Sequence, residues 1–256
     1  MKYMRMVVFG FALLTTGATH APAPEPDRYQ DCLAQLDRNA EAALDDAESW
    51  ADEGGGGAAR HCAALALVKL GRTAEAARRF TALAKEPDAG DAALRAQLYA
   101  QAGNAWLLAG QPKAAYSAFS QALALAPDDS DARFDRARAA VIAQDFGAAR
   151  SDLDAVLKAH PDSADALILR ASTRREQGDL DGAACDADQA VLLAPNAPEA
   201  WLERGLVHSV RKERQAALAD WRQVLTMSPR GDAAEAAQQL IEQDALRKAP
   251  QPPASP

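Results

Sequence analysis

Residues 96–129 read AQLYAQAGNAWLLAGQPKAAYSAFSQALALAPDD, and this stretch decides the fold of the chain. It contains two apolar segments rich in alanine and leucine, which are strong helix formers. A turn around Gly110 and Gln111 separates them. Because proline disfavours helix in the residue before it, Pro127 ends the second segment. The stretch therefore predicts a pair of short helices.

The same pattern recurs at a step of 34 residues. Four positions of the unit keep their residue type through four successive copies. They are a proline (Pro127, Pro161, Pro195, Pro229), an alanine (Ala115, Ala149, Ala183, Ala217), an apolar residue (Leu123, Leu157, Val191, Leu225) and a small or β-branched residue (Ala122, Val156, Ala190, Val224). We expect Ser130, Ser163 and Asn196, which follow the proline turns, to cap the next helices. A single pair cannot bury both of its faces, so the pairs must stack.

Residues 96–231 resemble the tetratricopeptide repeat, whose 34-residue unit has characteristic aromatic, glycine, alanine and proline positions. The clearest copy has Tyr99, Gly103, Trp106, Gly110, Ala115, Phe119, Ala122 and Pro127. The resemblance implies an all-α fold, a right-handed solenoid of stacked antiparallel helix pairs. Two copies depart from the pattern, with Ala137 and Ala171 where glycine is usual and Arg133 at an aromatic position. We interpret these departures as tolerated packing variants.

The repeat also predicts the organisation of the whole chain. The expected units are a signal peptide (1–18), a Pro-rich spacer (19–27), capping helices from a degenerate repeat (28–56), a degenerate repeat with an insert (57–95), four repeats (96–129, 130–163, 164–197 and 198–231), a capping helix (232–247) and a disordered tail (248–256).

The first residues have the pattern of an export signal. Lys2 and Arg5 precede an apolar run of 13 residues, MVVFGFALLTTGA, against the roughly 20 that a membrane-spanning helix needs. We therefore predict an exported protein, most plausibly in the bacterial periplasm, with no membrane association after cleavage. The alternative is an uncleaved segment that anchors the chain to the inner membrane.

The charge distribution argues against nucleic acid as a partner. The formal net charge is −8, and residues 25–53 alone have ten acids against two arginines, which is also a net of −8. Binding to phosphates needs a basic stripe. No nucleophile–base set or metal-ligand spacing stands out, so we predict a non-catalytic protein without cofactor or metal.

Two of the three cysteines are candidates for a disulfide. Cys32 and Cys62 fall on the first helices of successive repeats, which pack side by side in such a solenoid. In an oxidising compartment we expect them to be bonded; the alternative is two separate buried thiols. We expect Cys185 to be a buried small apolar residue.

In this family the first helix of each repeat lines a concave groove that binds a peptide or a helix. Carried over to this chain, the partner-binding positions are Gln97, Asn104, Leu108, Asp131, Phe134, Arg138, Ile142, Asp165, Ile168, Arg175, Glu199 and Leu202. The alternative is that some of the apolar ones touch the neighbouring repeat. Only Asn104 matches the family's carboxylate clamp, so we expect no such clamp.

The resemblance points to an interaction scaffold or adaptor of the bacterial envelope that binds a protein or peptide. The alternatives are an accessory subunit of an envelope enzyme or assembly complex, and a solenoid that associates with itself.

Overall fold

The computed structural model describes residues 25–86 and 89–248, and it contains thirteen α-helices and no strand in that part of the chain. The all-α solenoid of stacked helix pairs is therefore confirmed. The helices are α1 (Glu25–Leu36), α2 (Ala40–Asp52), α3 (Gly56–Lys69), α4 (Thr73–Lys85), α5 (Ala92–Leu108), α6 (Pro112–Leu125), α7 (Ser130–Ile142), α8 (Phe146–Ala159), α9 (Ala164–Glu176), α10 (Leu180–Leu193), α11 (Pro198–Val210), α12 (Arg214–Met227) and α13 (Asp232–Lys248).

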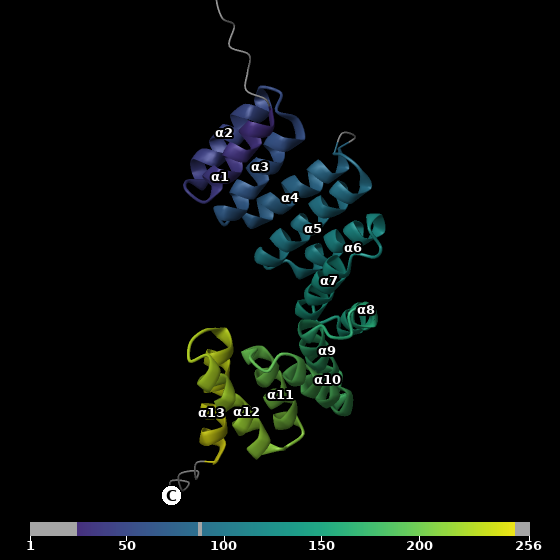
Figure 1. Ribbon diagram of the computed structural model, residues 1–256, viewed down its shortest axis with the longest axis vertical. Coiled ribbons are helices and arrows are strands. Elements are labelled where there is room, and N and C mark those ends of the chain that lie inside the picture. Colours follow the sequence, from purple (N-terminus) through teal and green to yellow (C-terminus); the bar gives the residue numbers. More distant parts are fainter. Residues whose placement is uncertain (1–24, 87–88, 249–256) are drawn as a thin grey trace, which may run out of the picture.

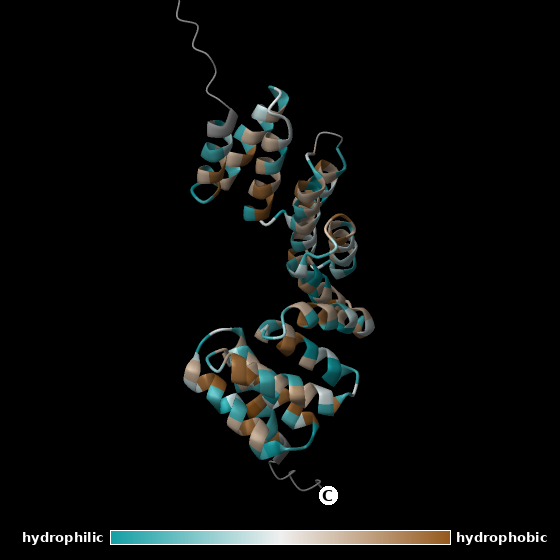
Figure 2. Ribbon diagram, turned by 45° about the vertical axis from the view of Figure 1, so that its right-hand side comes forward, coloured by the Kyte–Doolittle hydropathy of each residue, from teal (hydrophilic) through white to brown (hydrophobic). Residues whose placement is uncertain are grey.

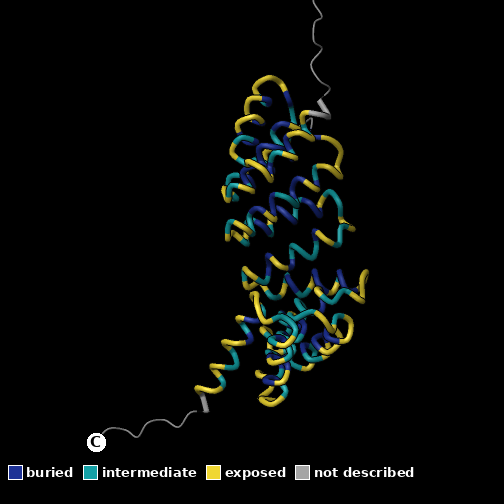
Figure 3. Tube along the Cα trace, turned by 60° about the vertical axis from the view of Figure 1, so that its left-hand side comes forward, coloured by how far each residue is buried: buried dark blue, intermediate teal, exposed yellow. Residues whose placement is uncertain are grey.

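The helices pack in chain order. Each helix contacts the next one, and the first helices of successive pairs also touch, as α9 and α11 do. The stack curves, so that the purple N-terminal helices and the yellow α13 lie toward the same side of the molecule (Figure 1). Hydrophilic residues occupy most of the connecting loops (Figure 2), and α13 is exposed or half-buried from residue 238 to residue 246 (Figure 3). Stacking thus gives each pair a partner for both faces, and α13 closes the array.

Inside a repeat, residue size at two facing positions is matched. A Cβ added at Gly103 would lie 2.7 Å from the Phe119 ring, and one at Gly205 would lie 2.4 Å from the Trp221 indole nitrogen. The other two repeats have alanine at this position and a smaller facing residue, as Ala137 with Leu153 and Ala171 with Ala187. The departures from the sequence pattern are therefore compensated packing variants.

The turn between the two helices of a repeat has a fixed geometry. One residue there has a positive φ in every repeat, and the amide after it donates to a carbonyl in the last turn of the first helix. The positive-φ residues are Gly71, Gly110, Gln144, Gly178 and Lys212. This is the Schellman arrangement, which satisfies carbonyls that a helix end leaves free.

The helix caps differ in part from expectation. Ser163 accepts a hydrogen bond from the Ala166 amide and is a cap as predicted. Asp129 does this for α7 instead of Ser130, which is the first helical residue. Asn196 was a wrong prediction too, because Ala197 precedes α11 and Pro198 starts it. Proline has no backbone N–H group, so the first position of a helix leaves no donor unpaired when proline occupies it.

The insert predicted before residue 96 belongs to a helix. Helix α5 begins at Ala92, and the Asp91 side chain accepts a hydrogen bond from the Leu94 amide. The extra residues therefore add a turn to α5. The unit boundaries drawn from the sequence stay an interpretation, since helix ends do not define where a 34-residue unit starts.

The predicted signal peptide lies outside the described residues, as does the predicted tail apart from Lys248. The last residues of the predicted spacer, 25–27, belong to α1. Within the described ranges, no helix is both long enough and apolar enough to cross a bilayer.

Candidate functional site

A column of exposed apolar side chains follows the ends of the first helices. Leu108, Ile142 and Val210 occupy the same position of their repeats and are 67%, 58% and 49% exposed. In the repeat that lies between those of Ile142 and Val210, Glu176 occupies this position. Exposed apolar groups that recur in register along a repeat array favour contact with a partner. Two of the three were predicted from the sequence; Val210 was not.

Three predicted groove residues, Asp131, Phe134 and Asp165, line one depression of about 330 Å³. The depression lies between the starts of α7 and α9. His160 Nε2 and Ser130 Oγ, 3.1 Å apart, lie at its edge. Two carboxylates beside a half-buried aromatic ring can contact a segment that has both polar and apolar groups.

Three of the predicted apolar anchors are half-buried. Phe134 and Ile168 pack against the core cluster that contains Leu153 and Leu167. Leu202 packs against the cluster that joins α12 to α13. These side chains therefore contact neighbouring helices and offer only part of their surface to a partner.

Two predicted groove arginines have partners within the chain. Arg175 Nε donates to Glu203 Oε1 at 2.8 Å and so connects α9 to α11. Glu203 is only 6% exposed. Burial raises the pKa of its carboxyl, and the Arg175 guanidinium opposes that rise. Arg138 pairs with Asp135 at 2.7 Å. The remaining predicted positions are exposed polar residues, namely Gln97, Asn104 and Glu199.

A column of ion pairs with buried aspartates was not predicted from the sequence. In three successive repeats, an arginine of the first helix makes a two-pronged hydrogen bond to a buried aspartate of the second helix. The pairs are Arg136 with Asp152, Arg170 with Asp186 and Arg204 with Asp220, at 2.7–2.9 Å. The hydrogen bonds that each arginine donates to its aspartate raise the pKa of that arginine. The pairs could have been found in the sequence, because the arginine and the aspartate each recur every 34 residues, as the prolines do.

Each of these arginines also reaches back to the preceding repeat. The second contacts are Arg136 to Ser120 at 3.2 Å, Arg170 to Asp154 at 2.9 Å and Arg204 to Asp188 at 3.5 Å. One guanidinium thus connects three helices. In each case the arginine contacts the second helices of two neighbouring repeats.

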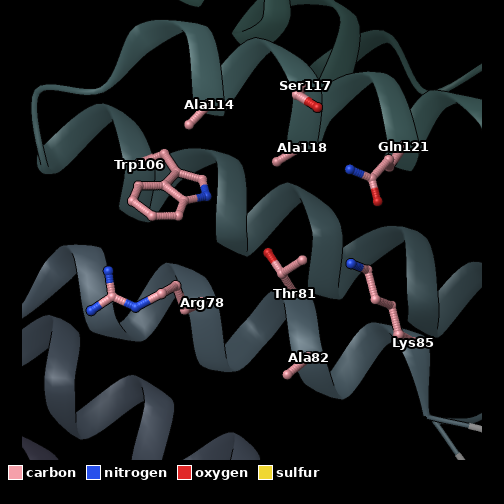
Figure 4. Close-up of a pocket in the computed structure, with 9 residues that line it drawn as sticks. All are labelled: Arg78, Thr81, Ala82, Lys85, Trp106, Ala114, Ser117, Ala118 and Gln121. Atoms are coloured by element: carbon pink, nitrogen blue, oxygen red, sulfur yellow. The ribbon is translucent and has the colours of Figure 1, made fainter.

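The repeat at 96–129 has Ala102 and Ala118 at the two positions of the pair. The groove between α4 and α6 is open there, with a volume of about 390 Å³. Figure 4 shows Arg78 and Trp106 at one end of this groove and Lys85 at the other.

The N-terminal helices contain the two cysteines. Cys32 of α1 and Cys62 of α3 form a disulfide in this structure, with their Cα atoms 6.5 Å apart. Cys185 is exposed, which corrects the expectation that it is buried. The buried face of α10 is formed by Ala183, Asp186 and Ala187, so Cys185 points away from it.

A half-buried histidine, His61, precedes Cys62 of the disulfide. His61 Nδ1 is 2.7 Å from the Tyr29 hydroxyl, and its Nε2 is 2.7 Å from Gln101 Oε1. Burial lowers the pKa of His61. In the described part of the chain, no three His, Cys, Asp or Glu side chains are grouped as a metal site would require.

These observations define the class of the protein: an α-solenoid of helical-hairpin repeats. A family model described as tetratricopeptide repeat matches residues 134–198. The match identifies residues 134–198 as tetratricopeptide repeats. No curated protein matches the sequence.

Solved structures share the fold at low identity. The protein YrrB, described as a TPR protein with an unusual peptide-binding site, is 17% identical with a TM-score of 0.56, over 76% of this chain and 96% of that one. MamA is 16% identical with a TM-score of 0.55, over 70% and 96%. The C-terminal part of a TPR repeat-containing protein from Cytophaga hutchinsonii is 14% identical with a TM-score of 0.63, over 83% and 87%.

Proposed function

We propose that this chain is a non-catalytic interaction scaffold that binds a protein or peptide along the first helices of its repeats. The observation that supports this most directly is the exposed apolar column of Leu108, Ile142 and Val210. Exposed polar residues such as Asn104 flank it. Apolar anchors within a polar surround are the usual composition of an interaction site.

A structural use for the charged side chains supports the non-catalytic part of the proposal. Inside the repeats, the buried acids Asp152, Asp186 and Asp220 are engaged by arginines. An acid held in this way stabilises helix packing and is not poised as a general base.

We further propose that the scaffold works in the bacterial envelope, in the periplasm. The export pattern of residues 1–18 supports this, together with the pairing of Cys32 and Cys62, because disulfides persist in oxidising compartments.

The test is crosslinking in the native envelope followed by mass spectrometry. We would compare the unaltered protein with a Leu108→Ser, Ile142→Ser, Val210→Ser variant. These side chains are largely exposed, so the fold should persist while the partner is lost. A control with Leu192→Ser, Leu193→Ser and Leu246→Ser alters exposed apolar residues elsewhere. An unchanged set of partners in the first variant would refute the assignment of this face.

A further inference from the structure

The groove between α4 and α6 differs from the grooves that follow it. In the next three, a guanidinium lies between the second helices, as Arg136 does between Ser120 and Asp152. The corresponding residues around the α4–α6 groove are Ala102, Thr81 and Ala118. Thr81 and Ala118 both line the open volume of about 390 Å³, so this volume lies where an arginine bonds to both second helices elsewhere.

The charge of this groove is positive. Arg78 and Lys85 both line it and both are exposed, and no acidic residue lines it. Neither makes a salt bridge within 25–86 and 89–248, whereas the neighbouring Arg79 pairs with Glu48 and Glu75. Two cations on one groove that form no salt bridge with the described residues favour an anionic partner.

The spacing of the two cations sets the geometry of such a partner. Arg78 and Lys85 are seven residues apart on one helix, about 10 Å along its axis at 1.5 Å per residue. Two carboxylates seven residues apart on a second helix would match that distance. Between the cations, Ala82 and Ala118 provide a small apolar floor, and the Trp106 indole forms a wall.

We propose that the α4–α6 groove binds an acidic amphipathic helix of a partner protein. Its two carboxylates would pair with Arg78 and Lys85, and an apolar side chain between them would lie on Ala82 and Ala118. This surface is formed mainly by second helices, so it is distinct from the apolar column on the first helices. The chain would then have two docking surfaces.

The test uses the full mature chain and a labelled, alanine-based helical peptide with two glutamates seven residues apart and leucine between them. Fluorescence anisotropy measures the affinity. We expect binding that weakens at high salt, and a loss of about tenfold or more in an Arg78→Glu, Lys85→Glu variant. Lys158→Glu is the matched control, because Lys158 is exposed at the corresponding position of α8 and should leave the affinity unchanged.

A second variant separates a fitted site from diffuse attraction. Ala82→Trp fills the groove at an exposed position and keeps both cations, so it should weaken binding while circular dichroism stays unchanged. If Ala82→Trp binds the peptide as the unaltered chain does, the groove is not the site and the proposal is wrong.

The acidic helix α2 of a second copy is the competing occupant. Light scattering that shows a dimer, which the Arg78→Glu, Lys85→Glu variant abolishes, would overturn the proposal in favour of self-association. The triple serine variant of the first-helix column should bind the peptide normally. Loss of the envelope partner and loss of the peptide are therefore separable results.

Discussion

The N-terminal and C-terminal parts of the solenoid are held together in different ways. In α1 to α6, most buried residues belong to one apolar cluster that reaches Ala132 of α7. From α7 to α12, the apolar core is divided into smaller clusters, and each repeat adds a buried arginine–aspartate pair. The same fold thus tolerates either an apolar or an ionic contact at one pair of positions.

The comparison shows what the ion pairs contribute. Removing two charges from water costs about as much as their attraction returns, so a buried pair adds little net stability over an apolar replacement. Each pair does fix which helices meet, because a two-pronged hydrogen bond has strict geometry. Ala102 and Ala118 pack without a directional hydrogen bond. The N-terminal part contains a covalent link between helices, the Cys32–Cys62 disulfide.

The largest expected effect comes from breaking one ion pair. Arg136→Ala leaves the buried Asp152 carboxylate without its guanidinium, and we expect a loss of about 3–5 kcal/mol in the free energy of unfolding. The double variant Arg136→Ala, Asp152→Ala has alanine at both positions of the pair, as the 96–129 repeat does, and should recover most of the lost stability. Urea unfolding followed by circular dichroism measures both.

The control for this prediction is Arg138→Ala. Arg138 pairs with Asp135 at the surface, so its loss should cost about 0.5 kcal/mol or less. A double variant as unstable as Arg136→Ala alone would show that the two parts of the solenoid are not interchangeable at this position.

The next largest effect concerns the N-terminal part. Reduction of the Cys32–Cys62 bond, or Cys32→Ser, should destabilise α1 to α3 by about 2–4 kcal/mol, because the unfolded chain gains freedom. Thermal melts with and without reductant measure this, with Cys185→Ser as the control. Equal melts under both conditions would mean that the bond is absent or contributes nothing.

The smallest expected effect is a pH dependence of the stability of the N-terminal part, which contains His61. Burial lowers the pKa of His61, so the unfolded chain takes up a proton at a higher pH than the folded chain. Stability should therefore fall as the pH drops below the unfolded value of 6.5, and level off below the folded pKa. His61→Gln should remove this component from melts taken between those limits; an unchanged profile would refute it.

Repeat patterns made much of the fold predictable and part of the candidate site. Leu108 and Ile142 could be placed because their positions recur with the repeat. Phe134 and Leu202 follow the same rule but pack on neighbouring helices, and sequence position alone does not reveal how much of a side chain a neighbour covers. The prediction that Cys185 is buried rests on its residue type and is wrong, because the position of a residue around the helix decides its burial.

By itself, the sequence determined the helix pairs and their order, since proline, alanine and apolar residues at a 34-residue step act through local geometry and short-range packing. The three-dimensional packing was needed to show that Arg136, Arg170 and Arg204 bond across neighbouring repeats and that a depression is present between α4 and α6. That outcome depends on contacts among three helices at once, which no single helix encodes.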